Sequence, residues 1–317
     1  MSKGARVVAT MLMPIVGRFL TRTFVAGWSK EEALAKARVF ISDGYAVSLN
    51  NLVEHVTSAV VVEQNVKEAL ALIALMRTEG IAANLAIKPS SLGGVAALCG
   101  TSFNSILFCK NLVCILDALR IAPRSVELEI DAEGYATCDH VFDVVCALRQ
   151  THTEGSRLRL ALQMHDLGVG QKLHEANRAQ LSLRIVKGAP VYAEATVLSE
   201  LSEKEIERRA RAVFRVCMER GTTVPYGAVM WSRDTALAYH KTGEFYRREG
   251  GPQEYKIQML YGVGGKLTHE LHAQGVPVAI YMAYLPDWAK REEAMDYIAR
   301  RVESGIDLLL RKVTHWF

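Results

Sequence analysis

The sequence predicts an α/β protein that folds as a (β/α)8 barrel. Short apolar segments typical of buried strands alternate with longer helical segments along the 317 residues. Eight such units suit a closed parallel barrel, whose usual length is about 250 residues. The alternative, an open doubly wound sheet, requires a glycine-rich phosphate turn after an early strand. The nearest segment to that pattern, Gly168-Val169-Gly170, comes in mid-chain and has no third glycine.

The strands and helices are expected to alternate. Strands are predicted at Tyr45–Leu49, Ala83–Lys88, Val126–Asp131, Leu158–Gln163, Leu181–Lys187, Val224–Met230, Tyr255–Leu260 and Val278–Met282. Helices are predicted at Lys30–Ile41, Glu63–Arg77, Asn104–Leu119, His140–Gln150, Gly170–Ala179, Glu203–Glu219, Arg233–Arg248, Gly264–Ala273 and Lys290–Val302. Capping-box spacing at Ser29/Glu32 and Ser202/Glu205 supports two helix starts. Gly44, Gly80 and Gly275 stand where helices should end.

Composition places the chain among ordinary globular proteins. Residues 1–44 are expected to form N-terminal helices that pack on the barrel, and residues 45–317 the barrel itself. The apolar run Val7–Val16 is too short to span a bilayer. A net charge of +4 without a clustered basic face argues against a nucleic-acid binder. The six cysteines lack metal-binding spacing, which is typical of reduced cysteines in a cytoplasmic protein, and no metal site is expected.

Polar and aromatic residues collect where the predicted strands end, which is where barrels of this kind carry catalytic groups. They are Lys88, Asp131, Gln163, Arg184, Lys187, Trp231, Gln258 and Tyr281, with Tyr297, Arg300 and Arg301 on the last predicted helix. The set is rich in cations, and none of the nine histidines belongs to it. Plainer interpretations remain open. Lys88 and Asp131 would then form a structural ion pair, and the two arginines a solvated helix face.

The predicted strand Leu181–Lys187 carries two cations although its composition is that of a buried strand. Arg184 and Lys187 are three residues apart, so their side chains point to opposite faces of the strand. A cation delivered into a core is costly unless something anionic meets it. Arg184 is therefore expected to hold an anion or a ring that becomes electron-rich on reduction, and a structural ion pair is the alternative.

Six segments carry a family resemblance in a constant order. They are Val47–Glu54, Ala86–Gly93, Glu129-Ile130-Asp131-Ala132-Glu133, Leu183-Arg184-Ile185-Val186-Lys187-Gly188-Ala189, Ile257–Gly262, and Ile280-Tyr281 followed by Tyr297–Arg301. They are similar to the patterns L-G-E, S-V-K-x-x-x-L-G, I-D-x-E, R-[LIV]-V-K-G-A-Y, F-Q-x-L-Y-G, and V-Y with Y-x-x-R-R. These patterns are those of proline dehydrogenases, FAD enzymes with a distorted (β/α)8 barrel. The chain therefore resembles a divergent member of that family.

The resemblance implies a cofactor, a reaction and roles for the strand-end residues. FAD would be held by Gln163, Arg184, Lys187, Gly188 and Trp231, with Arg184 beside the flavin N5. The substrate pocket would be formed by Lys88, Asp131, Leu260, Tyr281, Tyr297, Arg300 and Arg301, the two arginines pairing with a carboxylate. The reaction would be hydride transfer from the carbon beside a ring nitrogen to the flavin, which yields a cyclic imine. A quinone or another electron acceptor would reoxidise the enzyme.

Departures from the family patterns lie at the rim of the expected pocket. Pro190 replaces the tyrosine after K-G-A, and Val229-Met230-Trp231-Ser232 replaces the A-T-H-[ND] stretch. These changes favour a substituted or proline-like substrate over plain proline. They also leave open a barrel that has lost flavin redox chemistry and binds a different amino acid or imine. The amphipathic segment Ile306–Phe317 is expected to cap the barrel, with a peripheral contact to the inner membrane as the alternative.

Overall fold

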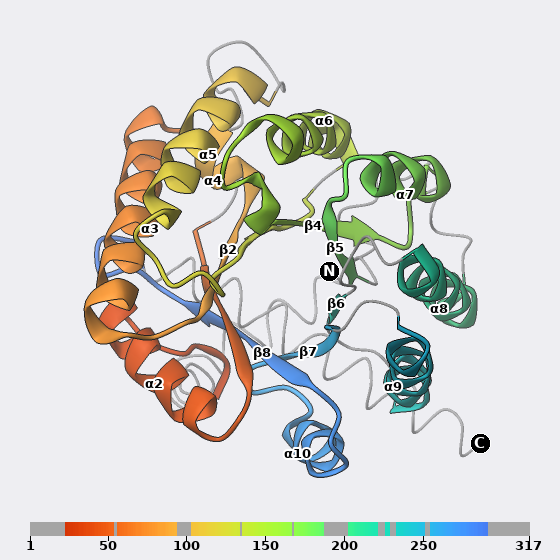
Figure 1. Ribbon diagram of the computed structural model, residues 1–317. Coiled ribbons are helices and arrows are strands. Elements are labelled where there is room, and N and C mark those ends of the chain that lie inside the picture. Colours follow the sequence, from red (N-terminus) through yellow and green to blue (C-terminus); the bar gives the residue numbers. More distant parts are fainter. Residues whose placement is uncertain are drawn as a thin grey trace, which may run out of the picture.

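The computed structural model shows a closed barrel of eight parallel strands in the order β1 to β8 (Figure 1). It describes residues 23–53, 56–93, 103–133, 135–166, 168–186, 202–220, 226–228, 233–250 and 254–290. Each strand pairs with the next along the chain, and β8 closes the barrel on β1. The predicted fold class, a (β/α)8 barrel, is confirmed.

The eight predicted strands are all present. They are β1 (Ala46–Asn51), β2 (Asn84–Ile87), β3 (Leu128–Ile130), β4 (Leu158–Gln163), β5 (Ser182–Val186), β6 (Tyr226–Ala228), β7 (Lys256–Leu260) and β8 (Val278–Tyr284). β3 is shorter than expected at both ends, since it begins at Leu128 rather than Val126 and ends at Ile130 rather than Asp131. β8 is longer than expected because it stays paired with β1 as far as Tyr284.

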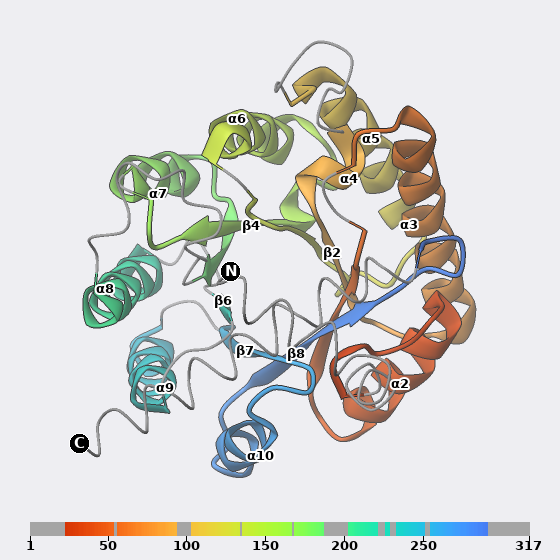
Figure 2. The same ribbon diagram turned by 180° about the vertical axis from the view of Figure 1, so that it is seen from behind.

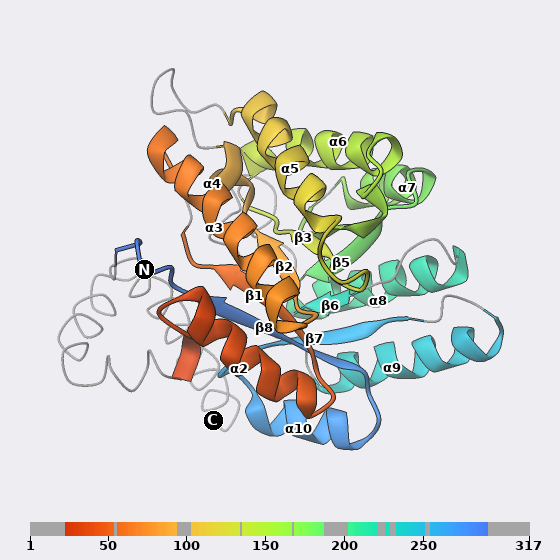
Figure 3. The same ribbon diagram turned by 60° about the vertical axis from the view of Figure 1, so that its left-hand side comes forward.

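Helices surround the strands on the outside, as the views from both ends show (Figures 1 and 2). They are α2 (Lys30–Ser42), α3 (Ala59–Glu79), α4 (Pro89–Gly93), α5 (Ser105–Leu119), α6 (Tyr135–Thr151), α7 (Val169–Arg178), α8 (Glu203–Arg220), α9 (Arg233–Arg248) and α10 (Gly265–Ala273), with the short 3-10 helix η1 (Gly155–Arg157) before β4. Seen from the side, α3 and α5 lie next to each other along the barrel wall (Figure 3).

Several helix ends follow local chemistry. Ser29 caps α2, its Oγ accepting the Glu32 N–H at 3.2 Å. Gly80 ends α3 in the left-handed region at φ 65°, where a residue without Cβ is unstrained. α3 begins at Ala59, four residues before the predicted start at Glu63. The sequence missed this first turn because it holds three valines, which are weak helix formers, and packing against the barrel outweighs that preference.

Side chains along each strand point alternately outward and inward, so the strands separate an outer apolar layer from the barrel interior. Outward-facing residues such as Leu49, Leu85 and Ile130 are apolar and join the helices in one large core. Inward-facing residues on the same strands include several polar ones, for example Ser48 and Glu129, which contact each other across the barrel. Because successive side chains of a strand point to opposite faces, each strand can contribute apolar residues to the outer core and polar residues to the barrel interior.

The remaining expectations about organisation concern parts of the chain outside the described ranges. Those are the part of the predicted N-terminal helices before Thr23, the ninth predicted helix Lys290–Val302 beyond its first residue, and the tail Ile306–Phe317. The boundary at residue 44 stays a prediction, although α2 packs against β1 and β8. In the ranges that the structure describes, no helix combines the length and apolar character needed to cross a membrane.

Candidate active site

The barrel interior is organised around Glu129, a carboxylate on β3 that is 0 % exposed. Three uncharged donors reach it. The Ser48 hydroxyl donates to Oε1 at 2.7 Å, the Asn84 amide donates to Oε1 at 3.0 Å, and the Gln258 amide donates to Oε2 at 3.1 Å. These donors come from β1, β2 and β7, so the carboxylate draws three separate strands together.

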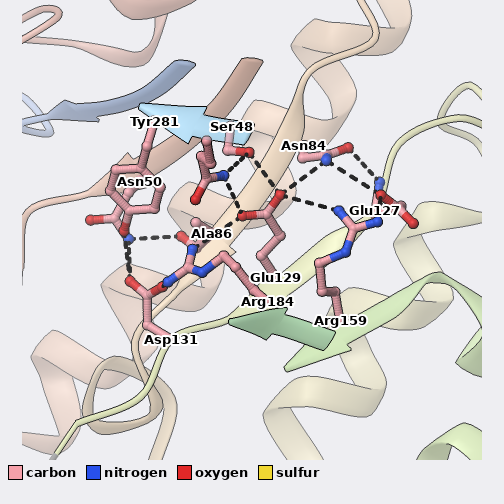
Figure 4. Close-up of polar contacts among 11 residues, drawn as sticks. Ser48, Asn50, Asn84, Ala86, Glu127, Glu129, Asp131, Arg159, Arg184 and Tyr281 are labelled. Atoms are coloured by element: carbon pink, nitrogen blue, oxygen red, sulfur yellow. Dashed lines mark hydrogen bonds and ion pairs between the residues drawn. The ribbon is translucent and has the colours of Figure 1, made fainter. Parts of the chain in front are cut away.

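Two arginines approach the same carboxylate from opposite sides (Figure 4). Arg184 Nη1 on β5 donates to Glu129 Oε2 at 3.1 Å, and Arg159 Nη1 on β4 lies 3.6 Å from Oε1. Each arginine also has a second carboxylate partner. Arg184 Nη2 donates to Asp131, and Arg159 Nη2 lies 2.6 Å from Glu127 Oε2. We call these five charged residues, Glu127, Glu129, Asp131, Arg159 and Arg184, the interior charge network.

The electrostatics follow from these pairings. Burial alone raises the pKa of Glu129, but the charges of Arg184 and Arg159, with the bonds from Ser48 and Gln258, lower it below the ordinary value. Burial lowers the pKa of the Arg184 guanidinium, and Asp131 with Glu129 more than reverses this, so it is raised. Glu129 and Arg184 therefore stay charged in the interior.

A hydrogen-bonded chain leads from this network toward the C-terminal end of the strands. The Tyr281 hydroxyl on β8 donates to Asp131 Oδ2 at 2.6 Å, and its ring lies 5.2 Å from Arg184 Cζ. Asn50 Nδ2 lies 3.5 Å from the same Asp131 oxygen, and Asn50 Oδ1 accepts from Lys88 Nζ at 2.8 Å. Lys88 also donates to the Asn51 carbonyl at 3.0 Å. Asn50 thus connects Lys88 to Asp131.

Two further residues at this end of the barrel are held by the backbone around Glu133. Gln163, the last residue of β4, donates its side-chain amide to the Glu133 carbonyl at 3.0 Å. The Glu133 carboxylate accepts from the Ser90 N–H at 2.6 Å and the Ser90 hydroxyl at 2.8 Å. The loop after β3 is therefore tied to β4 on one side and to the start of α4 on the other.

The interior also presents an apolar patch. Ala86, Leu260 and Tyr281 form a small cluster of their own, with Val263 packed against it, apart from the large core between strands and helices. The patch lies beside the Arg184 guanidinium, because that group sits over the Tyr281 ring. A flat apolar surface next to a fixed cation is suited to an aromatic ring that gains negative charge.

A second polar group of residues lies outside the barrel wall, between β8 and α3. Glu68 accepts from the Tyr284 hydroxyl at 3.2 Å, and its other oxygen lies 3.5 Å from Lys30 Nζ. Glu68 and Tyr284 line a small hollow that also reaches Lys88. Burial raises the pKa of Glu68, and Lys30 with the Tyr284 hydroxyl offsets only part of that rise.

Comparison with known proteins decides the family. The family model described as "Proline dehydrogenase" matches residues 33–304. The chain belongs to the proline dehydrogenase family, a family of oxidoreductases. Its similarity to characterised members is nevertheless low. It is 22% identical over 265 residues to proline dehydrogenase 2 of Bacillus subtilis, covering 83% of this chain and 81% of that protein. It is 25% identical over 292 residues to proline dehydrogenase of Deinococcus radiodurans, covering 89% and 85%.

Solved structures agree with the family fold. Proline utilization A from Bdellovibrio bacteriovorus, inactivated by N-propargylglycine, superposes with a TM-score of 0.76 at 16% identity over 90% of this chain. The corresponding protein from Bradyrhizobium japonicum gives a TM-score of 0.67 over 89% of this chain. This chain spans only about a third of those longer proteins, 32% and 30%.

The structure brings half of the predicted proline dehydrogenase site together. Arg184, Asp131 and Tyr281 are in mutual contact, Leu260 packs on Tyr281, Lys88 joins through Asn50, and Gln163 lies at the same end. The plainer interpretation paired Lys88 with Asp131, and the structure shows Arg184 as a charged partner of Asp131. The other predicted site residues lie outside the described ranges: Lys187, Gly188, Trp231, Tyr297, Arg300 and Arg301.

Sequence reasoning missed the deeper layer of the site. It looked for polar residues at the C-terminal ends of strands. Four residues of this layer lie further inside their strands: Ser48, Asn84, Glu129 and Arg159. A signal for them was present. Polar residues repeat with period two in otherwise apolar strands, as in Glu129 with Asp131 and Ser48 with Asn50. That spacing places each pair on one face of its strand, which here is the inner face.

Proposed function

We propose that this protein oxidises proline, or a proline-like cyclic amino acid, to the cyclic imine with FAD as its cofactor. Family membership supports the oxidation. The observation that carries the flavin proposal is Arg184, a cation 6 % exposed whose Nε makes no hydrogen bond in the described part of the chain. Such a fixed donor with an unbonded Nε–H fits a ring that becomes electron-rich.

The other residues of the interior fit the same cofactor. FAD, when bound, supplies the acceptor for a hydride leaving the carbon beside the substrate's ring nitrogen. The apolar patch of Ala86, Leu260 and Tyr281 offers packing for a ring system. Arg184, Gln163, Lys187, Gly188 and Trp231 are the residues that we assign to holding the cofactor.

The chain's own residues explain why no strong base is required. Both oxygens of Asp131 are engaged, one by Arg184 and the other by the Tyr281 hydroxyl at 2.6 Å. Asp131 therefore fixes Arg184 and the Tyr281 ring rather than taking a proton. This suits a reaction in which the amine binds already deprotonated and only a hydride is transferred.

The substrate carboxylate needs cations at the mouth of the barrel. Lys88 lies there, held by Asn50 and the Asn51 carbonyl. We assign Arg300 and Arg301 to pairing with the carboxylate, because a guanidinium binds a carboxylate through two parallel hydrogen bonds. Tyr297 would line the same pocket. The electron acceptor, a quinone or another oxidant, belongs to this proposal, and the cytoplasmic location with peripheral membrane contact stays a prediction.

The test is a cofactor titration followed by an anaerobic substrate screen. FAD added to the purified protein should raise its apparent stability in a concentration-dependent way and give a bound flavin spectrum. L-proline or a substituted analogue should then bleach that spectrum. Cyclopentanecarboxylate, which has the ring and the carboxylate but no amine, should bind without bleaching.

A matched pair of variants ties the outcome to the site. Arg184→Lys should weaken FAD binding at least tenfold, because a lysine ammonium lacks the planar, forked N–H groups of a guanidinium. Arg178→Lys, a change at an exposed arginine on α7, should leave binding unchanged. A protein that takes up no FAD would overturn the proposal and favour the barrel without flavin chemistry. FAD that binds but is never reduced by a cyclic amino acid would overturn the substrate assignment.

A further inference from the structure

We propose that Glu129 is a positioning residue of the flavin site proposed above, and that its charge tunes how readily the bound flavin is reduced. The inference rests on the proposed function but concerns a residue that the pattern I-D-x-E, matched at Ile130–Glu133, does not include. Glu129 does not reach the mouth of the barrel. It would act through Arg184, whose Nη1 donates a hydrogen bond to Glu129 Oε2 at 3.1 Å.

The first step is geometric. Glu129 lies on β3 and Asp131 directly follows that strand, two residues on, so their carboxylates face the interior one above the other. Arg184 spans them, with Nη1 on Glu129 and Nη2 on Asp131. With both terminal nitrogens engaged, the guanidinium is held in one orientation, and Nε is the nitrogen left without a hydrogen bond among the described residues. By holding Nη1, Glu129 helps to leave the Nε edge of the Arg184 guanidinium available to a ligand.

The second step is the charge balance. Removing Glu129 would not leave either arginine without an anion, since Arg184 keeps Asp131 and Arg159 keeps Glu127 at 2.6 Å. Within the five residues of the interior charge network, three carboxylates face two arginines, so Glu129 gives this set one negative charge more than its arginines balance. Three uncharged donors, from Ser48, Asn84 and Gln258, hold that excess charge in place.

The third step links the charge to the cofactor. A negative charge behind Arg184 weakens the positive potential that the guanidinium projects toward a bound ring. Since reduction adds negative charge to the ring, the excess carboxylate disfavours reduction. Replacing Glu129 by its neutral isostere should therefore make the bound flavin easier to reduce.

The experiment measures the midpoint potential of the FAD-bound protein by spectroelectrochemistry. Glu129→Gln should raise the ratio of reduced to oxidised flavin at a fixed potential about tenfold, a shift of about 30 mV for a two-electron couple. Glu127→Gln is the matched control, because Glu127 shares Arg159 but its charge lies 23% exposed and away from Arg184. The control should shift the ratio less than twofold.

A conservative variant separates charge from architecture. Glu129→Asp keeps the charge but shortens the side chain, so the midpoint should stay near that of the wild type even though stability falls. A purely structural role would predict equal shifts for both variants, which would overturn the inference. Should Glu129→Gln fail to fold, Gln258→Met replaces it as the test. That change removes a donor shielding Glu129 Oε2 and should move the midpoint the opposite way.

The two proposals fail in different ways. If the wild-type protein binds no FAD, the proposed function falls before any potential can be measured. If the wild type binds FAD and Glu129→Gln has the midpoint of Glu127→Gln, the flavin proposal stands and the role of Glu129 falls.

Discussion

Two buried glutamates on either side of the barrel wall respond to burial in opposite ways. Glu129 inside the barrel is 0 % exposed and has a lowered pKa, whereas Glu68 outside it is 5 % exposed and has a raised pKa. Glu129 meets two arginines and three uncharged donors. Glu68 meets one lysine at 3.5 Å and one tyrosine hydroxyl.

The difference shows that partners, not depth, decide the state of a buried carboxylate. Desolvation raises the pKa at both sites, and only the interior of the barrel supplies enough cations and donors to reverse it. A closed ring of strands can direct side chains from many positions at one point. Between α3 and the barrel wall, fewer side chains can reach Glu68. The effect of burial on its pKa is therefore only partly offset.

The largest effect should follow from removing the cation that the interior is built around. Arg184→Met leaves Glu129 and Asp131 buried with one charged partner fewer between them, which should cost about 3–5 kcal/mol of unfolding free energy. Urea denaturation of the protein without cofactor measures this. Arg178→Met, on the exposed face of α7, should cost less than about 0.5 kcal/mol. A loss below about 1 kcal/mol at Arg184 would mean that the network contributes little to stability.

Glu129→Gln should have a smaller effect that depends on pH. Because the folded pKa of Glu129 is lowered, its contribution is present above the ordinary glutamate pKa of about 4.3 and is lost as pH falls through the folded value. We expect the variant to lose about 1–3 kcal/mol at pH 7, with the gap to the wild type narrowing in acid. Unfolding curves at pH 7, 5 and 4 check this. A gap that widens in acid would contradict the assigned sign.

Ser48→Ala removes one uncharged donor and keeps every charge. Its hydroxyl donates to Glu129 Oε1 at 2.7 Å, a bond to a charged acceptor that should be worth about 1–2 kcal/mol. The Asn84 amide still serves the same oxygen, which keeps the loss at the lower end of that range. Unfolding free energies at pH 7 test the estimate. Ser48 also accepts a hydrogen bond from Gln258 Nε2 at 3.0 Å, so a loss larger than that of Glu129→Gln would show that this second bond outweighs the one to Glu129.

Glu68→Gln should have the smallest effect, and with the opposite sign. The folded pKa of Glu68 is raised, so its contribution is present below the ordinary pKa and is lost as pH rises through the folded value. The variant should therefore be more stable than the wild type by up to about 1 kcal/mol at pH 8, without that gain at pH 4. Glutamine keeps an acceptor for Tyr284, and Lys30 keeps Glu31 at 3.4 Å. Equal stabilities at both pH values would contradict this.

The sequence predicted the positions of side chains better than their partners. Period-two spacing placed Arg184 in the interior, and the strand order put Asp131 and Tyr281 at the same end of the barrel. That Arg184 pairs with Glu129 and Asp131 was not predictable, because the pairing depends on how far β3 and β5 are staggered around the closed sheet. The Ser48–Gln258 contact joins residues 210 apart and has no local signal.

The seam between β1 and β8 has a consequence for how the molecule assembles. Six residue pairs from Ala46↔Ala279 to Asn51↔Tyr284 close the ring between the first strand and the last. Contacts so distant in sequence form late, since a long loop must be closed before they are gained. Gln258 reaches Glu129 from the strand next to that seam. We therefore expect water to reach the carboxylates of the incomplete ring until the seam closes, so that their dehydration belongs to the final step of folding.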